Sequence, residues 1–260
     1  MISVLTVNFR SSADLAGLAE SLRGHAGEEE VELIIANNSV DDAIDLCSDG
    51  RLTVKVVASA NIGFAAGINL AFRQARGESL LVANPDLRVV AGTLDTAAAF
   101  LKAHTDIGVA LPLLRYPGGE VQPSARRFYT WPVVLYARSP LRALKIRPAF
   151  FRDYLCEGLD RSRPSDVDWG LGGAMFLRRR DVDESGIFDE RFFLYFEDVD
   201  LCYRTWARGR RVVYCPEIAC IHAHRRHSGN PMSRAGWHHF LSFLRFVSKY
   251  RGLPRRPVGR

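Results

Sequence analysis

A cluster of carboxylates follows an aromatic run between positions 188 and 201, where the sequence reads FDERFFLYFEDVDL. Glu197, Asp198 and Asp200 come at its end, and the run predicts a strand or loop that delivers them to a helix. That helix would extend from about Asp198 through Trp206, with Gly209 just past its end. Carboxylates in a first turn suit the helix dipole, and aromatic neighbours limit water. Such a carboxylate is suited to general-base catalysis, and the alternative is an N-capping acid among buried aromatics.

The elements that must position these carboxylates follow from the order of apolar runs in the first part of the chain. Strands are predicted at 2–7, 31–36, 52–57, 79–83 and 107–111. Helices are predicted from about 12 to 22 and from 93 to 104, and the 61–69 stretch leads into a helix through about Arg76 that Gly77 ends; a polar turn at 37–42 opens a further short helix. Alternating strands and helices predict an α/β fold, with a mostly parallel sheet covered on both faces.

Polar residues gather where these strands end. Asn8, the 37–42 turn, the 61–69 segment and the 84–86 segment each follow a predicted strand. In such sheets ligands bind outside the carboxyl ends of the strands. Each cluster alone is more typical of a turn, but four at one edge indicate a binding site.

After position 112 the alternation stops. Gly118 and Gly119 predict a hairpin turn, and residues 124–154 mix arginines with aromatics between prolines. This segment is expected to be a mobile loop with short helices, acting as a lid or membrane-facing patch, or simply a solvated insertion. Further strands are expected at 172–177, 211–215 and 218–222. A final amphipathic helix covers 237–247, and the basic tail 251–260 is expected to be disordered.

Composition bounds the class of protein. The 260 residues suffice for one large or two small domains, and 47% hydrophobic with 25% charged residues is ordinary for a soluble globular chain. No apolar run approaches the ~20 residues of a membrane span, and residues 1–4 predict a strand rather than a signal peptide. The net charge of +6 would suit nucleic acid, an anionic membrane surface or a phosphorylated substrate.

The cysteines indicate the redox compartment. There are five, at positions 47, 156, 202, 215 and 220, an odd number without metal-like spacing. They predict buried thiols in a reducing cytosol, with no disulfide or zinc site.

With these motifs in place, the sequence resembles the family 2 glycosyltransferases of the GT-A fold, within them the bacterial rhamnosyltransferase-like group. The matching stretches, in the family's order, are 7–8 with 37–41, 61–69, 84–86, 172–174 with 188–193, and 197–201; 216–222 fits the end of the pattern. The resemblance implies a single Rossmann-like GT-A domain over 1–250. Residues 1–112 would form its nucleotide-sugar-binding half, and 113–250 the acceptor-binding and catalytic half with a C-terminal helical region.

The resemblance implies a divalent metal, Mg²⁺ or Mn²⁺, beside the diphosphate of the donor. Asp86 matches the family's metal ligand, and Asn84 stands where the usual motif has its first acid. The alternative for Asp86 is a turn-forming residue after proline. His222 matches a histidine near the diphosphate or metal, although His224 and His227 are close enough to take that place.

The resemblance also implies where the nucleotide binds. Asn37 replaces the family's usual acid, so the base preference stays open. Asp41 would contact ribose or cap a helix, and glycines would allow close backbone approach. The implied nucleotide-contacting residues are Val7, Asn8, Asn37, Ser39, Asp41, Asn61, Gly63, Phe64, Gly67, Asn69, Asn84 and Gly173.

For the reaction, the resemblance implies that Asp198 deprotonates an acceptor hydroxyl, which displaces the diphosphate from the anomeric carbon with inversion. Glu197 would orient or tune Asp198, and Asp200, two positions along the helix, would be structural. Retention of Asp86, Asp198 and His222 argues against a catalytically dead scaffold.

The subgroup implies transfer of L-rhamnose from dTDP-rhamnose to a polyprenyl-diphosphate-linked glycan in cell-envelope polysaccharide synthesis. The basic, aromatic 124–154 segment and the final helix suggest a peripheral enzyme on the inner face of the plasma membrane, in contact with anionic lipid. A homodimer is compatible with this interpretation. One alternative is a UDP-hexose or UDP-N-acetylhexosamine donor. Another is a nucleic-acid-binding protein, disfavoured because the charge is modest and no such motif is present.

Overall fold

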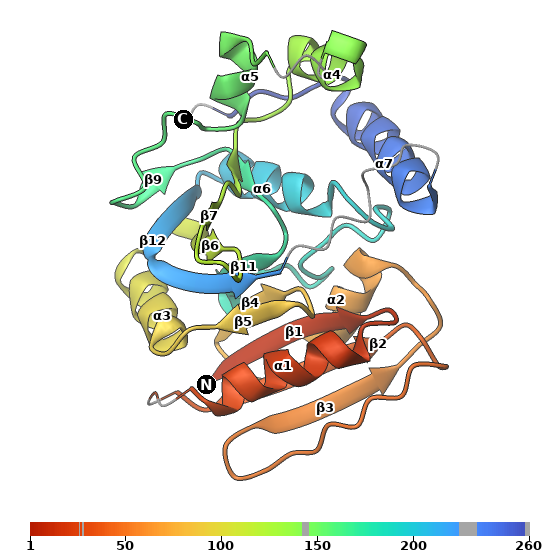
Figure 1. The fold of residues 1–260 in the computed structure, drawn as a ribbon, viewed down its shortest axis with the longest axis vertical. Helices are drawn as coiled ribbons and strands as arrows, with labels where there is room; N and C mark the ends of the chain where they lie inside the picture. The colour runs from red at the N-terminus through yellow and green to blue at the C-terminus, as the bar shows by residue number, and fades with distance from the viewer. Residues whose placement is uncertain (26, 28, 142–145, 224–232, 258–260) are drawn as a thin grey trace.

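The structure is a computed structural model that describes residues 1–25, 27, 29–141, 146–223 and 233–257. Over these residues a mixed sheet runs through the molecule, with helices packed against both faces (Figure 1). The predicted α/β class, with a sheet flanked by helices, is confirmed. Along the main path the strands are β3 (Thr53–Ala58), β2 (Val31–Asn37), β1 (Ile2–Asn8), β4 (Ser79–Ala83), β11 (Ala174–Arg178), β6 (Ile107–Arg115), β12 (Arg211–His222) and β5 (Leu87–Val89).

The first half of the sheet has the expected parallel pairing. β1 pairs in parallel with both β2 and β4, and β2 with β3. The second half is mixed, because β11 enters antiparallel to both β4 and β6 while β12 pairs in parallel with β6. β7 (Val121–Gln122) closes a hairpin with β6 around the predicted turn, β9 (Ser165–Asp166) pairs with β12, and β8 (Ala125–Arg126) pairs with β10 (Trp169–Gly170).

Alternation along the strands builds two hydrophobic cores, one on each face. In β4, Leu80 and Val82 face one core and Leu81 and Ala83 the other, as the two-residue period of a strand requires. α1 (Ser12–Arg23) and α3 (Thr93–Ala103) cover one face. The other core includes residues of α2 (Phe64–Phe72), α4 (Trp131–Arg138), α5 (Ala149–Tyr154), α6 (Glu197–Ala207) and α7 (Arg234–Tyr250).

The segment after the 37–42 turn differs from the prediction. A short helix was expected there, but residues 43–49 form neither helix nor strand. Ile44 and Leu46 pack on the core while their neighbours Ala43, Asp45 and Cys47 are exposed. Burial of every second residue is typical of an extended chain and not of a helix. The packing of Ile44 and Leu46 on the core therefore holds this segment extended.

Two further predictions are corrected, and two short elements were not predicted. α2 ends at Phe72, before the predicted Arg76, whose backbone N–H donates instead to Glu32 Oε1 at 2.6 Å. Cys47 is exposed, although the other four cysteines are buried and free as expected. The sequence analysis also missed β5 and a 3₁₀ turn at Arg179–Asp181, which are too short to show a period.

The tail was predicted to be disordered, and for residues 251–257 this is wrong. Arg256 donates to Asp168 Oδ1 at 2.7 Å, and its guanidinium lies 4.2 Å from the ring centroid of Trp206. An ion pair combined with cation–π stacking holds the tail against the body. Residues 258–260 lie outside the described residues.

No helix among the described residues is both long enough and apolar enough to cross a bilayer.

Candidate functional site

The start of α6 presents the two carboxylates. Tyr195 and Phe196 have φ angles of 67° and 69°, in the left-handed region, and this sharp turn swings the aromatic run into the helix. Glu197 is therefore the first helical residue, one position earlier than predicted. Backbone N–H groups hold the carboxylate of Asp198: Val199 donates to Oδ1 at 2.8 Å and Gly172 to Oδ2 at 3.0 Å.

Burial raises the pKa values of both carboxyl groups. It raises the pKa of Asp198 to about 6, against the lowering effect of its backbone hydrogen bonds. The pKa of Glu197 lies well above its usual value because of burial and the neighbouring Asp198 charge, and in the described part of the chain its Oε2 atom finds no hydrogen-bond partner. The charge of Asp198 is one cause of the raised pKa of Glu197, so Asp198 ionises before Glu197. A half-buried carboxylate with a pKa near 6 is a competent base.

Asp200, the third acid of the cluster, is wholly buried and structural, as expected. Its carboxylate accepts hydrogen bonds from Arg204 at 2.8 Å, from the Tyr250 hydroxyl at 2.7 Å and from Lys249. Lys249 also donates to Asp189 Oδ2 at 2.8 Å. These bonds tie the first turn of α6 to α7.

A second group of polar side chains forms where β4 and β12 end. His222 Nε2 lies 3.2 Å from Asp86 Oδ1 and 3.2 Å from Asn84 Nδ2. Its other ring nitrogen, Nδ1, lies 2.9 Å from Gln122 Oε1 in the β6–β7 hairpin. A tautomer with the proton on Nδ1 donates to Gln122 and turns the Nε2 lone pair toward Asp86.

The Asp86–His222 pair fits a divalent cation. Carboxylate oxygen and neutral imidazole nitrogen are ordinary ligands, and the Gln122 contact is the kind that orients a ligating histidine. Over the described residues, no group of three or more His, Cys, Asp or Glu side chains forms a metal centre. Two protein ligands suffice where diphosphate oxygens complete the shell. His224 and His227 lie outside the described residues.

Two successive glycines join the base to this pair. A Cβ built on Gly172 would lie 3.4 Å from Asp198 Cβ, and one on Gly173 would lie 2.8 Å from His222 Cε1. The carbonyl of Gly173 accepts the backbone N–H of Asn84 at 3.0 Å. The Gly172–Gly173 step, the peptide link between these two glycines, thus lies between the candidate base and the candidate cation site. At position 173 only glycine avoids a clash with the His222 ring.

The ends of β1 and β2 form a network of amides. Asn8 Nδ2 donates to Asn37 Oδ1 and to Asp42 Oδ2, both at 3.0 Å. The backbone N–H of Ser39 donates to Asn37 Oδ1 at 3.1 Å. Hydrogen bonds from Ser12 and Asn8 lower the pKa of Asp42. An ionised carboxylate therefore stands beside Asn37, where the family's usual acid is absent.

The loop before α2 comes close to the aromatic run. Gly63 has φ of 87°, and a Cβ there would lie 2.4 Å from the carbonyl oxygen of Phe193. The backbone N–H of Phe64 donates to the same carbonyl at 2.7 Å, and Asn61 Oδ1 accepts from Gly63 at 3.3 Å. Asn38 Nδ2 donates to the Gly63 carbonyl at 2.9 Å and joins this loop to the amide network.

Four predicted nucleotide contacts lie in different surroundings. Val7 is buried against Gly67, where a Cβ would lie 2.7 Å from Val7 Cγ2. Asn69 is wholly buried, and its amide accepts from Phe188 N at 3.0 Å and donates to Phe188 O at 2.8 Å. Asp41 is exposed and pairs with Arg10 at 3.3 Å. Asn69 thus anchors the aromatic run, and only Asp41 of these four presents its side chain to solvent.

The sequence analysis missed Asp42 and Gln122. Asp42 belongs to the polar turn that was singled out, and its position after β2 was the signal that could have identified it. Gln122 follows a hairpin turn, and nothing in the local sequence distinguishes it. Only the pairing of Leu114 with Gln122 in the β6–β7 hairpin places it beside the end of β12.

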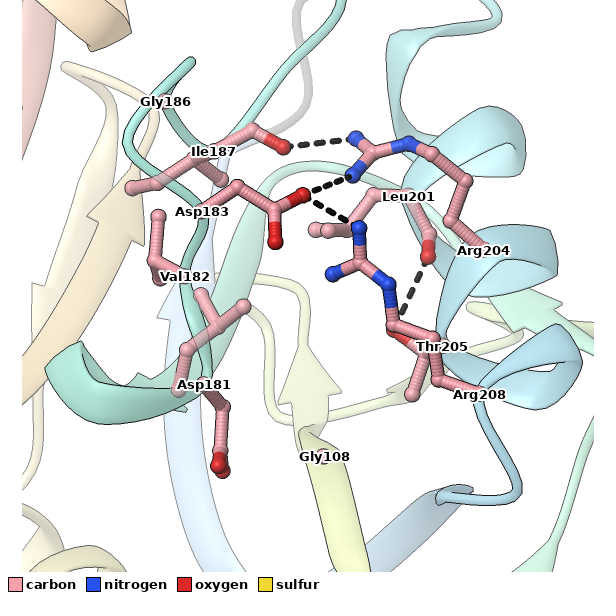
Figure 2. A pocket seen from close by; sticks show the side chains of 11 residues that line it. Gly108, Asp181, Val182, Asp183, Gly186, Ile187, Leu201, Arg204, Thr205 and Arg208 are labelled. Carbon is pink, nitrogen blue, oxygen red and sulfur yellow. Dashed lines mark hydrogen bonds and ion pairs between the residues drawn. The ribbon is translucent and has the colours of Figure 1, made fainter.

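The described cavities lie elsewhere. One cavity, of about 20 Å³, adjoins the C-terminal half of α6 and has room for a single water. Figure 2 shows that Arg204 donates there to the carbonyl oxygen of Ile187, and that Asp183 pairs with both Arg204 and Arg208. Another, of about 300 Å³, is lined in part by Asp183 and Arg204. Neither is lined by the candidate base or by the Asp86–His222 pair, so neither is the candidate site.

Comparison with known proteins places this geometry in a family. Residues 3–186 match the model described as Glycosyl transferase family 2, a span that holds the amide network and Asp86 but ends before Asp198. The chain is 29% identical to "N-acetylglucosaminyl-diphospho-decaprenol L-rhamnosyltransferase" of Mycobacterium tuberculosis, over 99% of this chain and 88% of that one. It is 22% identical to "Rhamnosyltransferase WbbL" of Escherichia coli, over 100% and 97%.

A solved structure, of GalNAc-T7 with UDP, GalNAc and Mn²⁺, shares the fold with a TM-score of 0.66 and 15% identity. The likeness covers 95% of this chain and 48% of that one. At this identity the likeness concerns the fold alone, which is of the GT-A type predicted from the sequence.

Proposed function

Since the chain belongs to glycosyl transferase family 2, and is a glycosyltransferase, we propose that it transfers L-rhamnose from dTDP-rhamnose. The acceptor would be a hydroxyl of a polyprenyl-diphosphate-linked glycan, and the product would serve cell-envelope polysaccharide synthesis. The names of the relatives from M. tuberculosis and E. coli support the sugar, and the first of them supports the lipid-linked acceptor.

The observation that carries the chemistry is the Gly172–Gly173 step between two unlike groups. On one side Asp198 is held by the Gly172 N–H, with its pKa raised to about 6. On the other side His222 and Asp86 meet at 3.2 Å. A sugar placed over this step would have a base on one side and a cation site on the other, as a single inverting displacement requires.

In the proposed reaction the ionised Asp198 takes the proton of the acceptor hydroxyl. The hydroxyl oxygen forms its bond to the anomeric carbon while the bond to the diphosphate oxygen breaks, and the diphosphate leaves with the electron pair. Burial and the Asp198 charge raise the pKa of Glu197 well above its usual value, and Glu197 would tune Asp198 from the adjacent position. The two backbone N–H groups hold the Asp198 oxygens in place during the transfer.

Asp86 and His222 would hold a divalent cation, Mg²⁺ or Mn²⁺, with Asn84 beside them. Bound there, the cation would supply the positive charge that stabilises the diphosphate as it leaves. The nucleotide would lie over the ends of β1 and β2. Asn37 and Asp42 would then face the base or ribose, while Gly63 and Gly173 would allow close approach.

The proposal is tested first by nucleotide binding. Thermal shift with dTDP, UDP and GDP, each with and without Mn²⁺ or Mg²⁺, should show a metal-dependent rise in Tm with dTDP. The rise should disappear in Asp86→Ala and persist in Asp45→Ala, an exposed aspartate of the 43–49 segment. A rise with UDP alone would keep the enzyme class and replace the donor. No shift with any nucleotide would refute the donor site.

The second test is transfer. NMR of the product formed from dTDP-rhamnose and a lipid-diphosphate-linked N-acetylglucosamine acceptor should show an anomeric configuration opposite to that of the donor. Retention of configuration would refute the single displacement by Asp198. We further propose that the enzyme works peripherally on the inner face of the plasma membrane, where such an acceptor is anchored.

A further inference from the structure

The charges of the chain are strongly segregated. Residues 124–152 hold seven Lys or Arg and no Asp or Glu, and residues 218–260 hold nine and none. The remainder of the chain carries 19 cations and all 29 acids, a formal net charge of −10. The overall charge of +6 therefore conceals two stretches without acids, separated by the 65 residues 153–217, in a chain whose remainder is acidic.

The fold brings these two stretches together. The first forms α4, the connection that follows it, and most of α5; the second includes α7, and the three helices gather at one end of the molecule (Figure 1). The guanidinium of Arg138 in α4 lies 5.3 Å from the ring centroid of Phe240 and 5.4 Å from that of Phe243, both in α7. Tyr136 of α4 also contacts Phe150 and Phe151 of α5. One basic surface therefore spans α4, α5 and α7.

Large apolar side chains are exposed on the same surface. Trp131 and Leu135 stand one turn apart in α4, and Trp237 and Leu244 two turns apart in α7, with exposed fractions between 46% and 68%. Ile146, between α4 and α5, is 66% exposed. Exposed tryptophan and leucine among the cations of α4, α5 and α7, where Asp153 is the one acid in the three helices, suit the boundary between lipid headgroups and acyl chains. Nucleic acid would favour the charge but not the aliphatic side chains.

This surface is coupled to the candidate base. The ring of Tyr129, just before α4, stacks on Phe196 with centroids 5.3 Å apart, and His239 of α7 lies 5.3 Å from the same ring. Phe196 caps α6, directly before Glu197 and Asp198. Docking through α4 and α7 would thus hold the base close to the plane in which a lipid-linked acceptor is anchored.

We propose that the surface of α4, α5 and α7, with Trp131, Leu135, Trp237 and Leu244 as its apolar anchors, binds a bilayer containing anionic phospholipid. This inference rests on the proposed function for its acceptor. It assigns the membrane-facing side of the molecule and the class of lipid that it selects.

The test is flotation of the full chain with phosphatidylcholine vesicles, prepared with and without roughly 30% of the anionic lipid phosphatidylglycerol. The wild type should float with the anionic vesicles and bind the neutral ones at least about tenfold more weakly. Arg152→Gln/Arg245→Gln should weaken anionic binding about 25-fold, about fivefold per cation. Leu135→Ser/Trp237→Ser should weaken it at least about tenfold.

The matched control is Val56→Ser/Lys102→Gln, which changes an exposed apolar residue and an exposed cation outside the two basic stretches and should bind as the wild type does. Transfer to a short-chain, water-soluble acceptor should stay within about twofold in all variants, showing that they fold and that the site is intact. Equal binding to neutral and anionic vesicles, undiminished binding by the two surface variants, or preferential capture of an oligonucleotide would each overturn the proposal. Absence of transfer with vesicle binding retained would refute the proposed function and leave the surface standing.

Discussion

Replacing Asp198 with Asn should abolish activity and at the same time stabilise the protein at neutral pH. The variant keeps the shape of the side chain but loses its charge and its ability to take a proton. Loss of a general base lowers kcat by about 10²–10⁴. The stability gain arises because burial penalises the ionised carboxylate, which is why the pKa of Asp198 rises from the ordinary aspartate value of 3.8 to about 6.

The size of the gain follows from that shift. At about 1.36 kcal/mol per pKa unit, ionising Asp198 costs the native state about 3 kcal/mol relative to the unfolded chain. A raised carboxyl pKa means that the native state holds its proton more tightly, so the cost grows as pH rises from 3.8 toward 6 and is complete above it. It amounts to about 1.6 kcal/mol at pH 5 and about 3 kcal/mol at pH 8.

The assay is urea unfolding of the wild type and Asp198→Asn at pH 5 and pH 8. Asn can accept only one of the two backbone N–H bonds, which subtracts about 1 kcal/mol at both pH values. The difference between the two proteins should still grow by about 1.4 kcal/mol from pH 5 to pH 8 in favour of the variant. The wild-type kcat/KM should fall on the acid side with an apparent pKa of about 6.

Two controls separate this carboxylate from its surroundings. The comparison is repeated in a Glu197→Gln background, because Glu197 interacts with Asp198 and its own ionisation could shift. Asp106→Asn should instead destabilise the protein, by the same amount at pH 5 and pH 8, because the hydrogen bond from Arg211 lowers the pKa of Asp106 and the linked stability is lost only at more acid pH. A stability difference that does not change with pH, together with an acid limb near pH 4, would refute the assignment of Asp198 as the buried base.

Three more outcomes are expected. Gln122→Leu should weaken metal-dependent nucleotide binding about 10–100-fold in calorimetric titration, since the contact that orients His222 is lost; unchanged affinity would separate this amide from the metal site. Arg256→Ala should lower the free energy of unfolding by about 1–3 kcal/mol, because the buried carboxylate of Asp168 loses the nearer of its two guanidinium partners and keeps only Arg127 at 3.6 Å, whereas exposed Arg255→Ala should be neutral in the same denaturation series. Gly63→Ala should destabilise the protein by more than about 2 kcal/mol, because strain at positive φ adds to a clash with the Phe193 carbonyl. Gly92→Ala, at φ of 78° with no atom near the added Cβ, should cost only the strain, about 1 kcal/mol. Equal losses of stability in the two variants would contradict the clash.

Local pattern was sufficient for elements whose contacts agree with it. β4 was predicted with its observed bounds because four apolar residues after Ser79 end at a proline-containing turn. α6 was predicted to within a residue because its acids, apolar spacing and final glycine all agree. Pattern failed at 43–49 and at the end of α2, where Ile44 packs in an extended chain and Arg76 binds Glu32. It failed again at the tail, because the partners of Arg256 lie 50 or more residues away.

The sequence by itself determined the fold class, the family and the residue types available for catalysis, because periodicity and motif order are local properties of the chain. Tertiary structure alone decided how those residues work together. Asp198 depends on a backbone N–H from position 172, and His222 on an amide from position 122. The pKa of Asp198 depends on its burial in the folded chain and on backbone hydrogen bonds, one of them from Gly172. Such contacts arise because β11, β6 and β12, which are distant in sequence, are neighbours in one sheet. Electrostatic energies depend on distances in space rather than on distances along the chain.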